Sequence, residues 1–258
     1  MWIDSHAHLD METFDQDREE VIARAFQRGV TKIITIGIDL ESSRRALSLA
    51  QAHDRIWATI GIHPHDAKER TEQDLSRLAE LALEPRVVAV GETGLDFFRN
   101  LSHREDQKDC FRRLIRLARE TALPLVIHDR QAHEEVLTIL REEKAGEIGG
   151  IFHCFSGDWD MAQRCLDLNF FISITGAITF KKGTVLEEVV RRAPLASLLI
   201  ETDAPYLTPH PYRGQRNEPA YLAYTADSVA RIRNMPLPEL SRALWENTHK
   251  AFRNRLGE

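Results

Sequence analysis

The sequence has little that would tie it to a membrane, an oxidising compartment or a strongly basic surface. Its three cysteines, Cys110, Cys154 and Cys165, have a spacing that matches no disulfide or metal motif. Reduced thiols of this kind are typical of a cytoplasmic protein, which is the location we expect. No apolar run approaches the roughly 20 residues that a membrane-spanning helix needs, and residues 1–6 lack the charged and apolar regions of a signal peptide. The formal net charge of −6 argues against binding duplex DNA by overall charge alone.

Short apolar runs alternate with amphipathic stretches along the chain, and this alternation is typical of a parallel sheet. Several runs are continuous, as in strands that are buried on both faces. Strands are predicted at residues 2–3, 32–38, 57–62, 87–90, 125–127, 150–152, 171–174 and 198–200. Helices are predicted at residues 18–27, 41–52, 72–83, 104–121, 132–144, 159–168, 185–192, 221–232 and 238–252. Because one (β/α)8 barrel closes at about 250 residues, we predict an α/β fold, a single TIM barrel with parallel strands, in one domain over residues 1–258.

Histidine or acidic residues follow most of the predicted strands. TIM barrels carry their active sites at the C-terminal ends of the strands, so these side chains should converge on one mouth. His6 and His8 are two residues apart, and in an extended segment such residues share a face and can bind one cation. The converging residues are His6, His8, His63, Glu92, His128, His153 and Asp203.

Glu92 is the candidate bridge between two metal ions, because a carboxylate has two oxygens. Its flanking glycines, Gly91 and Gly94, indicate tight backbone beside it. The alternative is a Glu92 that only pairs with Arg130. His128 and His153, on adjacent strands, can hold a second cation. Asp203 follows the last strand, which neighbours the first, so it can bind metal and also accept a proton from the attacking water. Glu201 or His63 would be the next base to consider.

The substrate-binding candidates lie around the same mouth. His63 is expected either to contact a substrate phosphate or to contact the metal ligands without binding metal itself. The long loop at residues 204–219 contains Tyr206 and Arg213, and long ordered loops are often functional. Basic residues in the loops can hold phosphates or simply face solvent; they are Arg99, Arg130, Lys181, Lys182, Arg213 and Arg216. Five more histidines are expected on the surface or on helices; they are His65, His103, His133, His210 and His249.

Several of these motifs together resemble those of a known family. They are IDSHAHLD at residues 3–10, GIHPH at 61–65, VGETGLD at 90–96, PLVIHDR at 124–130, HCFSG at 153–157, LIETDAPYL at 199–207 and NEP at 217–219. In this order and over nearly the whole chain, they resemble the TatD family of metal-dependent deoxyribonucleases, within the amidohydrolase-type barrels. The resemblance implies a divalent-metal hydrolase of phosphodiester bonds in DNA, acting as an exonuclease. It places the metal ligands at His6, His8, Glu92, His128, His153 and Asp203.

We therefore predict a nuclease with two divalent cations, with Asp203 and Glu92 as catalytic residues. His63, Arg130, Tyr206 and Arg213 are predicted to bind the substrate, DNA. Imidazole ligands suit Zn²⁺, Mn²⁺ and Ni²⁺, whereas Mg²⁺ prefers oxygen, so the metal stays open among these four. We expect no membrane partner, and a monomer.

Two other functions are compatible with parts of the pattern. The same metals could serve a carboxylic ester or amide hydrolase, such as an aminoacyl-tRNA deacylase. A nucleic-acid-binding module without catalysis is disfavoured by the complete ligand set and by the negative net charge, because such binding relies on a basic surface.

Overall fold

The computed structural model describes residues 1–181 and 183–257, and its centre is a sheet of eight parallel strands. The strands pair in chain order from β1 to β8. They are β1 (Trp2–Ala7), β2 (Val30–Ile36), β3 (Ile56–Ile60), β4 (Val87–Asp96), β5 (Leu125–Arg130), β6 (Gly150–Phe152), β7 (Phe170–Ile174) and β8 (Leu198–Ile200). This arrangement confirms the predicted TIM barrel with parallel strands.

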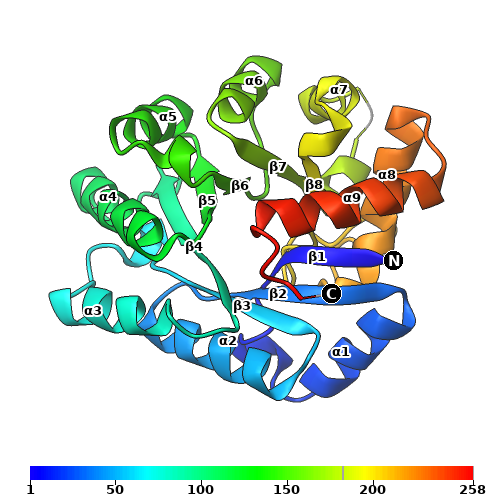
Figure 1. Ribbon diagram of the computed structural model, residues 1–258. Coiled ribbons are helices and arrows are strands. Elements are labelled where there is room, and N and C mark those ends of the chain that lie inside the picture. The colour runs from blue at the N-terminus through cyan, green and yellow to red at the C-terminus, as the bar shows by residue number, and fades with distance from the viewer. Residues whose placement is uncertain (182, 258) are drawn as a thin grey trace.

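Helices form a ring outside the strands (Figure 1). They are α1 (Arg18–Gln27), α2 (Leu40–Ala52), α3 (Glu72–Leu81), α4 (Arg104–Thr121), α5 (His133–Glu142), α6 (Trp159–Asp167), α7 (Val185–Arg192), α8 (Leu222–Arg233) and α9 (Leu237–Ala251). Side chains fix several helix starts: Asp39 and Thr71 form capping boxes at α2 and α3, and Asp158 accepts the Met161 N–H at α6. Among the described residues, no helix is long and apolar enough to cross a membrane.

The barrel closes where β1 meets the segment after β8. Ala7 and Ala204 form a parallel bridge, the Asp203 N–H donates to the His6 carbonyl at 2.9 Å, and the His8 N–H donates to the Ala204 carbonyl at 2.8 Å. Deeper in the barrel, the buried Asp4 carboxylate accepts the Thr202 N–H at 2.9 Å and its hydroxyl at 2.5 Å. A side chain thus replaces part of the backbone ladder at this seam.

The end of the barrel at which the strands begin is plugged by the C-terminal segment. After leaving α9, this segment passes over the strands (Figure 1). Phe252 and Leu256 are fully buried in the apolar cluster of the barrel interior. The Lys32 ammonium donates to the Leu256 and Gly257 carbonyls at 2.8 and 2.7 Å. His249, expected on the surface or a helix, lies on α9 but is buried, with its Nε2 3.4 Å from the Lys32 Nζ.

Strand β4 differs most from the prediction, because it continues to Asp96 instead of ending at Val90. Gly91 and Gly94 allow this by letting β4 approach β5 closely. A Cβ at Gly91 would lie 2.5 Å from the Val126 carbonyl oxygen, and one at Gly94 would collide with the His128 carbonyl. The other strands and helices match their predicted positions to within two residues at each end, except β1 and β5, which run on to Ala7 and Arg130.

Candidate metal centre

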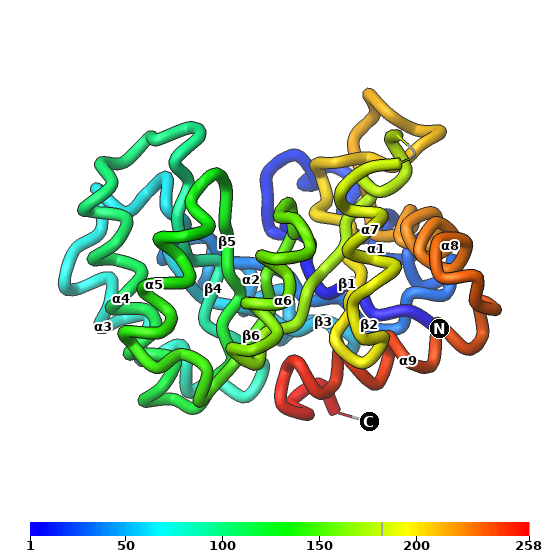
Figure 2. The backbone as a smooth tube through the Cα atoms, turned by 90° about the horizontal axis from the view of Figure 1, so that it is seen from above, coloured from blue at the N-terminus to red at the C-terminus, as the bar shows by residue number. Residues whose placement is uncertain are grey.

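The predicted ligands converge at the C-terminal ends of the strands. The loop after β4 and the loop at residues 204–219 rise at this end, away from the C-terminus (Figure 2). These two loops contribute to the wall of a cavity of about 740 Å³. Its wall includes His8, His63, Glu92, His128, His153 and Asp203. His6 lies beneath this wall and is fully buried.

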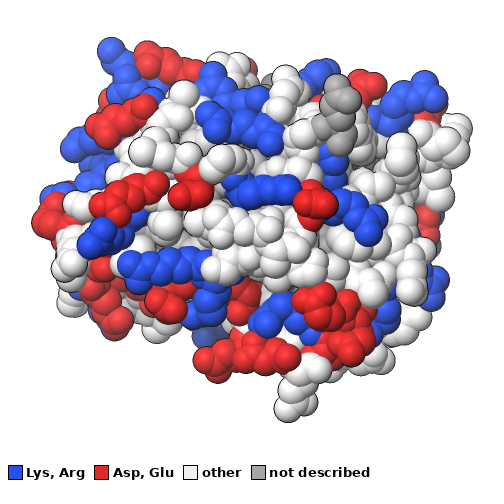
Figure 3. Space-filling model, turned by 60° about the horizontal axis from the view of Figure 1, so that its bottom comes forward, with Lys and Arg blue, Asp and Glu red and all other residues white. Residues whose placement is uncertain are grey.

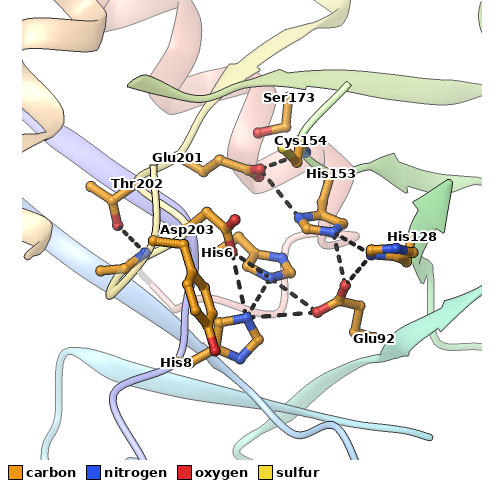
Figure 4. Close-up of polar contacts among 12 residues, drawn as sticks. His6, His8, Glu92, His128, His153, Cys154, Ser173, Glu201, Thr202 and Asp203 are labelled. Atoms are coloured by element: carbon orange, nitrogen blue, oxygen red, sulfur yellow. Dashed lines mark hydrogen bonds and ion pairs between the residues drawn. The ribbon is translucent and has the colours of Figure 1, made fainter. Parts of the chain in front are cut away.

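Four atoms gather on one side of Glu92 and form what we call half-site A: His6 Nε2, His8 Nε2, Glu92 Oε2 and Asp203 Oδ1 (Figure 4). The two imidazole nitrogens are 3.3 Å apart. The Glu92 oxygen lies 3.3 Å from His6 Nε2 and 3.7 Å from His8 Nε2, and the Asp203 oxygen lies 3.7 and 3.5 Å from the same two atoms. His6 lies on β1 and His8 directly follows it, Glu92 lies on β4, and Asp203 lies in the segment after β8.

Half-site B lies on the other side of the same carboxylate. Glu92 Oε1 is 2.8 Å from His128 Nδ1 and 2.9 Å from His153 Nε2. The two imidazole nitrogens are 3.4 Å apart. Half-site B therefore consists of Glu92 Oε1, His128 Nδ1 and His153 Nε2, and each Glu92 oxygen serves one half-site.

The spacing of half-site A and the chemistry of both half-sites fit bound cations. A tetrahedral ion with bonds of about 2.0–2.2 Å holds its ligand atoms about 3.3–3.6 Å apart. Half-site A comes close to this range, because its separations run from 3.3 to 3.7 Å. Half-site B is tighter, with 2.8 and 2.9 Å from the Glu92 oxygen to the two nitrogens and 3.4 Å between the nitrogens. Both half-sites combine imidazole nitrogens with carboxylate oxygen, which is the donor set that Zn²⁺, Mn²⁺ and Ni²⁺ accept. The residues present therefore fit divalent cations.

His63 lies beside half-site B, with its Nε2 3.4 Å from Glu92 Oε1. Its other ring nitrogen, Nδ1, accepts the backbone N–H of His65 at 3.1 Å. Burial, and then the charge of His128, lower the pKa of His63 to about 4, so the ring is neutral at pH 7. A neutral ring that accepts at Nδ1 carries its proton on Nε2. His63 therefore presents an N–H donor to the cavity and to Glu92, and does not offer this nitrogen to a metal.

The electrostatics of the centre keep its carboxylates charged. Burial alone would raise the pKa of Glu92, but the charge of His153 and the hydrogen bonds to His128 and His153 hold it well below its usual value. Asp203 behaves in the same way: burial opposes ionisation, but the hydrogen bond to His8 and the surrounding histidines together lower the pKa. Two ionised carboxylates among imidazoles can compensate the charge of divalent cations.

Three further residues belong to the site: Glu201, named from the sequence only as an alternative base, and Asp96 and His65, to which residue-type patterns gave no role. Glu201 Oε1 lies 3.4 Å from His153 Nδ1 and accepts the Cys154 N–H at 2.6 Å (Figure 4). Asp96 and His65 line the cavity, and their side chains meet at 2.9 Å. His65, expected on the surface or a helix, is therefore part of the mouth. Glu92 and Asp96 share the face of β4, since strand residues that are an even number apart point the same way.

The predicted substrate-binding residues occupy different places. Arg130 and Tyr206 line the cavity with His63. The Tyr206 ring lies 6.1 Å from the His8 ring, beside half-site A, and Arg130 ends the strand that carries His128, beside half-site B. Arg213 is not among the described residues that line this cavity; its guanidinium lies 4.0 Å from the centre of the Phe180 ring. Lys182 lies outside the described residues.

The fold and the site define a metal-dependent hydrolase built on a TIM barrel. Residues 3–253 match the protein family described as TatD related DNase. The chain belongs to this TatD family, as its sequence motifs indicated.

Relatives with names and structures agree with this membership. The chain is 46% identical to the Bacillus subtilis protein named uncharacterized metal-dependent hydrolase YabD, over 98% of this chain and 99% of that protein. It is 38% identical to an Enterobacter lignolyticus protein named 3'-5' ssDNA/RNA exonuclease TatD, over 96% and 98% of the two chains. The crystal structure of YjjV, a TatD homolog from Escherichia coli, superposes with a TM-score of 0.93 at 33% identity, covering 98% of each chain.

Proposed function

We propose that this protein is a nuclease that removes nucleotides from an end of single-stranded DNA, using two divalent cations and one barrel domain over residues 1–258. The position of Glu92 carries the proposal. Its two oxygens face two separate ligand sets, 2.8 Å from His128 Nδ1 and 3.3 Å from His6 Nε2. Paired divalent cations lower the pKa of a bound water molecule and neutralise charge on a phosphate and its leaving oxygen.

The chain's own groups have separate tasks in this proposal. Asp203 is held as a carboxylate, so it can take the proton of the attacking water at an oxygen atom. His63 keeps its Nε2–H directed at the cavity and can donate it to a phosphate oxygen. Arg130 and Tyr206 are placed in the cavity wall to hold the substrate, one by charge and one by stacking. Arg213 is proposed to contact the strand farther from the scissile bond.

The charge distribution supports binding at the mouth instead of over a broad surface. On the face shown in Figure 3, acidic and basic side chains are interspersed. Such a face offers little attraction for the backbone of a long duplex. Arg99 and Arg130 in the cavity wall provide local positive charge. The name 3'-5' ssDNA/RNA exonuclease, carried by a relative, supports a single strand as the substrate and the 3' end as the starting point.

The test is a comparison of substrates on one preparation. Metal-free protein is reloaded with Mg²⁺, Mn²⁺, Zn²⁺ or Ni²⁺ and incubated with end-labelled single-stranded DNA, duplex DNA, RNA and aminoacyl-tRNA. We expect single-stranded DNA to shorten stepwise from the 3' end, and the Asp203→Asn variant to serve as the matched inactive control. Rapid release of the amino acid from aminoacyl-tRNA, with DNA left intact under every metal, would instead establish the carboxylic ester hydrolase.

A further inference from the structure

The carboxylate of Asp96 joins two parts of the mouth that are otherwise separate. Asp96 is the last residue of β4 and is fully buried. Its Oδ2 lies 3.2 Å from His128 Nε2 and 2.9 Å from His65 Nε2. Its Oδ1 accepts the backbone N–H groups of Phe98 at 3.0 Å and Arg99 at 2.7 Å. Each oxygen thus has two partners, and the four lie on three different segments.

The contact with His128 decides which of its nitrogens can bind a cation. An ionised carboxylate only accepts hydrogen bonds, so the nitrogen that faces Asp96 carries the proton. The carboxylate of Asp96 is surrounded by donors, since the Phe98 and Arg99 N–H groups donate to Oδ1 and two imidazole nitrogens face Oδ2, and such surroundings favour the ionised form. His128 therefore donates from Nε2, which leaves Nδ1, 2.8 Å from Glu92 Oε1, as the nitrogen that can bind a cation. Two acceptors at that distance need a cation or a proton between them.

The contacts of Oδ1 fix the start of the loop between β4 and α4. Gln107 on α4 supports the same corner, because its Oε1 accepts the Asp96 N–H at 2.8 Å and its Nε2 donates to the Ser102 carbonyl at 2.9 Å. This loop supplies Arg99 and Leu101 to the cavity wall. The buried Asp96 carboxylate accepts two hydrogen bonds at the start of this loop. The position of the loop, and so of this part of the cavity wall, therefore depends on the same residue that orients His128.

We propose that Asp96 is a positioning residue that fixes the Nε2–H tautomer of His128, so that Nδ1 is free for the cation of half-site B, and that anchors the loop forming one wall of the substrate cavity. This inference deepens the proposed function, on which it rests, since it takes half-site B as a cation site. Carboxylates that orient metal-binding histidines typically change metal affinity by 10–100-fold when they are removed.

The Asp96→Asn variant tests the proposal sharply because it reverses the direction of the hydrogen bond between residue 96 and His128. The single amide oxygen can stay with the Phe98 and Arg99 N–H groups, which places the amide NH2 against His65 and His128. An NH2 group donates, so it favours a His128 ring with the proton on Nδ1. That tautomer cannot bind a cation through Nδ1. The matched control is Asp74→Asn, the same change on the exposed outer helix α3, where the carboxylate accepts the Thr71 N–H at 2.8 Å.

The first measurement is calorimetric titration of metal-free protein with Zn²⁺. We expect wild type and Asp74→Asn to bind two equivalents. Asp96→Asn should bind one equivalent normally and the other about 10–100-fold more weakly. Two equivalents bound by Asp96→Asn with unchanged affinity would overturn the proposal while leaving the proposed nuclease function intact.

The second measurement is NMR of isotope-labelled histidine in the Zn²⁺-loaded wild type, with the His128 signals assigned from a His128→Gln variant. Because this measurement uses the wild type, it tests the proposal even if the Asp96→Asn variant does not fold. A proton on Nε2 of His128 is the expected result, and a proton on Nδ1 would refute the role of Asp96 directly. DNA shortening by the wild type is scored separately, so failure of the proposed function shows as two bound cations and an Nε2–H tautomer without hydrolysis.

Discussion

Replacing Glu92 with glutamine should dismantle the metal centre without removing any side-chain volume. The carboxylate is almost completely buried, and its two oxygens lie 2.8 Å from His128 Nδ1 and 3.3 Å from His6 Nε2. An amide keeps one neutral acceptor and turns an NH2 donor toward the other half-site. The lost charge matters as well: two unit charges about 4 Å apart, at an effective dielectric constant of about 20, interact by about 4 kcal/mol. That energy corresponds to about 10³-fold in binding.

We therefore expect Glu92→Gln to retain at most one tightly bound cation and to lose at least about 10³-fold in turnover. Metal content and hydrolysis of labelled single-stranded DNA are measured on the same preparation, with circular dichroism to confirm the fold. Cys154→Ser is the comparison, because Cys154 adjoins the ligand His153 and has no assigned chemistry; it should lose far less. A Glu92→Gln protein with two cations and turnover within about tenfold of wild type would refute the bridging role.

Three further predictions follow from other contacts. Asp203→Asn should keep the fold and some metal but lose at least about 10²-fold in turnover; a metal-loaded variant with near-normal turnover would leave Glu201 as the next base to test. Removing bound metal with a chelator should lower the melting temperature by about 5–10 °C in scanning fluorimetry, since a ligand at 100 times its Kd stabilises the native state by about 2.7 kcal/mol; an unchanged melting temperature would contradict this. The hydrogen bond to Asp129 raises the pKa of His133, so its stabilisation is present below the unfolded pKa of about 6.5 and lost as the pH rises through the folded pKa. Urea unfolding should show a larger advantage of wild type over His133→Ala at acidic than at alkaline pH, and an equal advantage at both would refute it.

The convergence of the candidate ligands at one mouth was predictable because each lies at or just beyond the end of a buried apolar run. Asp96 and His65 were left without a role because neither lies directly after the end of a predicted strand. The prediction ended β4 at Val90, because the glycine-containing segment that follows reads as a turn. In the structure β4 continues to Asp96, so Asp96 faces the same way as Glu92. The spacing rule that linked His6 and His8 would have found Asp96 had the strand been extended.

Contacts between segments far apart in the chain had no local signal. In the sequence, Lys32 is simply the polar first residue of a predicted strand. Nothing in the residues beside it indicates that its ammonium donates hydrogen bonds to the Leu256 and Gly257 carbonyls. The tautomer of His63 depends in the same way on a backbone N–H that only coordinates can place. The expected cytoplasmic location and monomeric state stay predictions.

The seam between β1 and the segment after β8 gives the metal centre a role in the integrity of the barrel. His6 and His8 stand on one side of this seam and Asp203 on the other. A cation held by all three would act as a cross-link between the first and last strands, enclosing almost the entire ring of strands and helices in one loop. Cross-links that close long loops restrict the unfolded chain most strongly. Molecules whose ring has not closed could not assemble half-site A, so on the proposed function hydrolysis would be confined to chains that have completed folding.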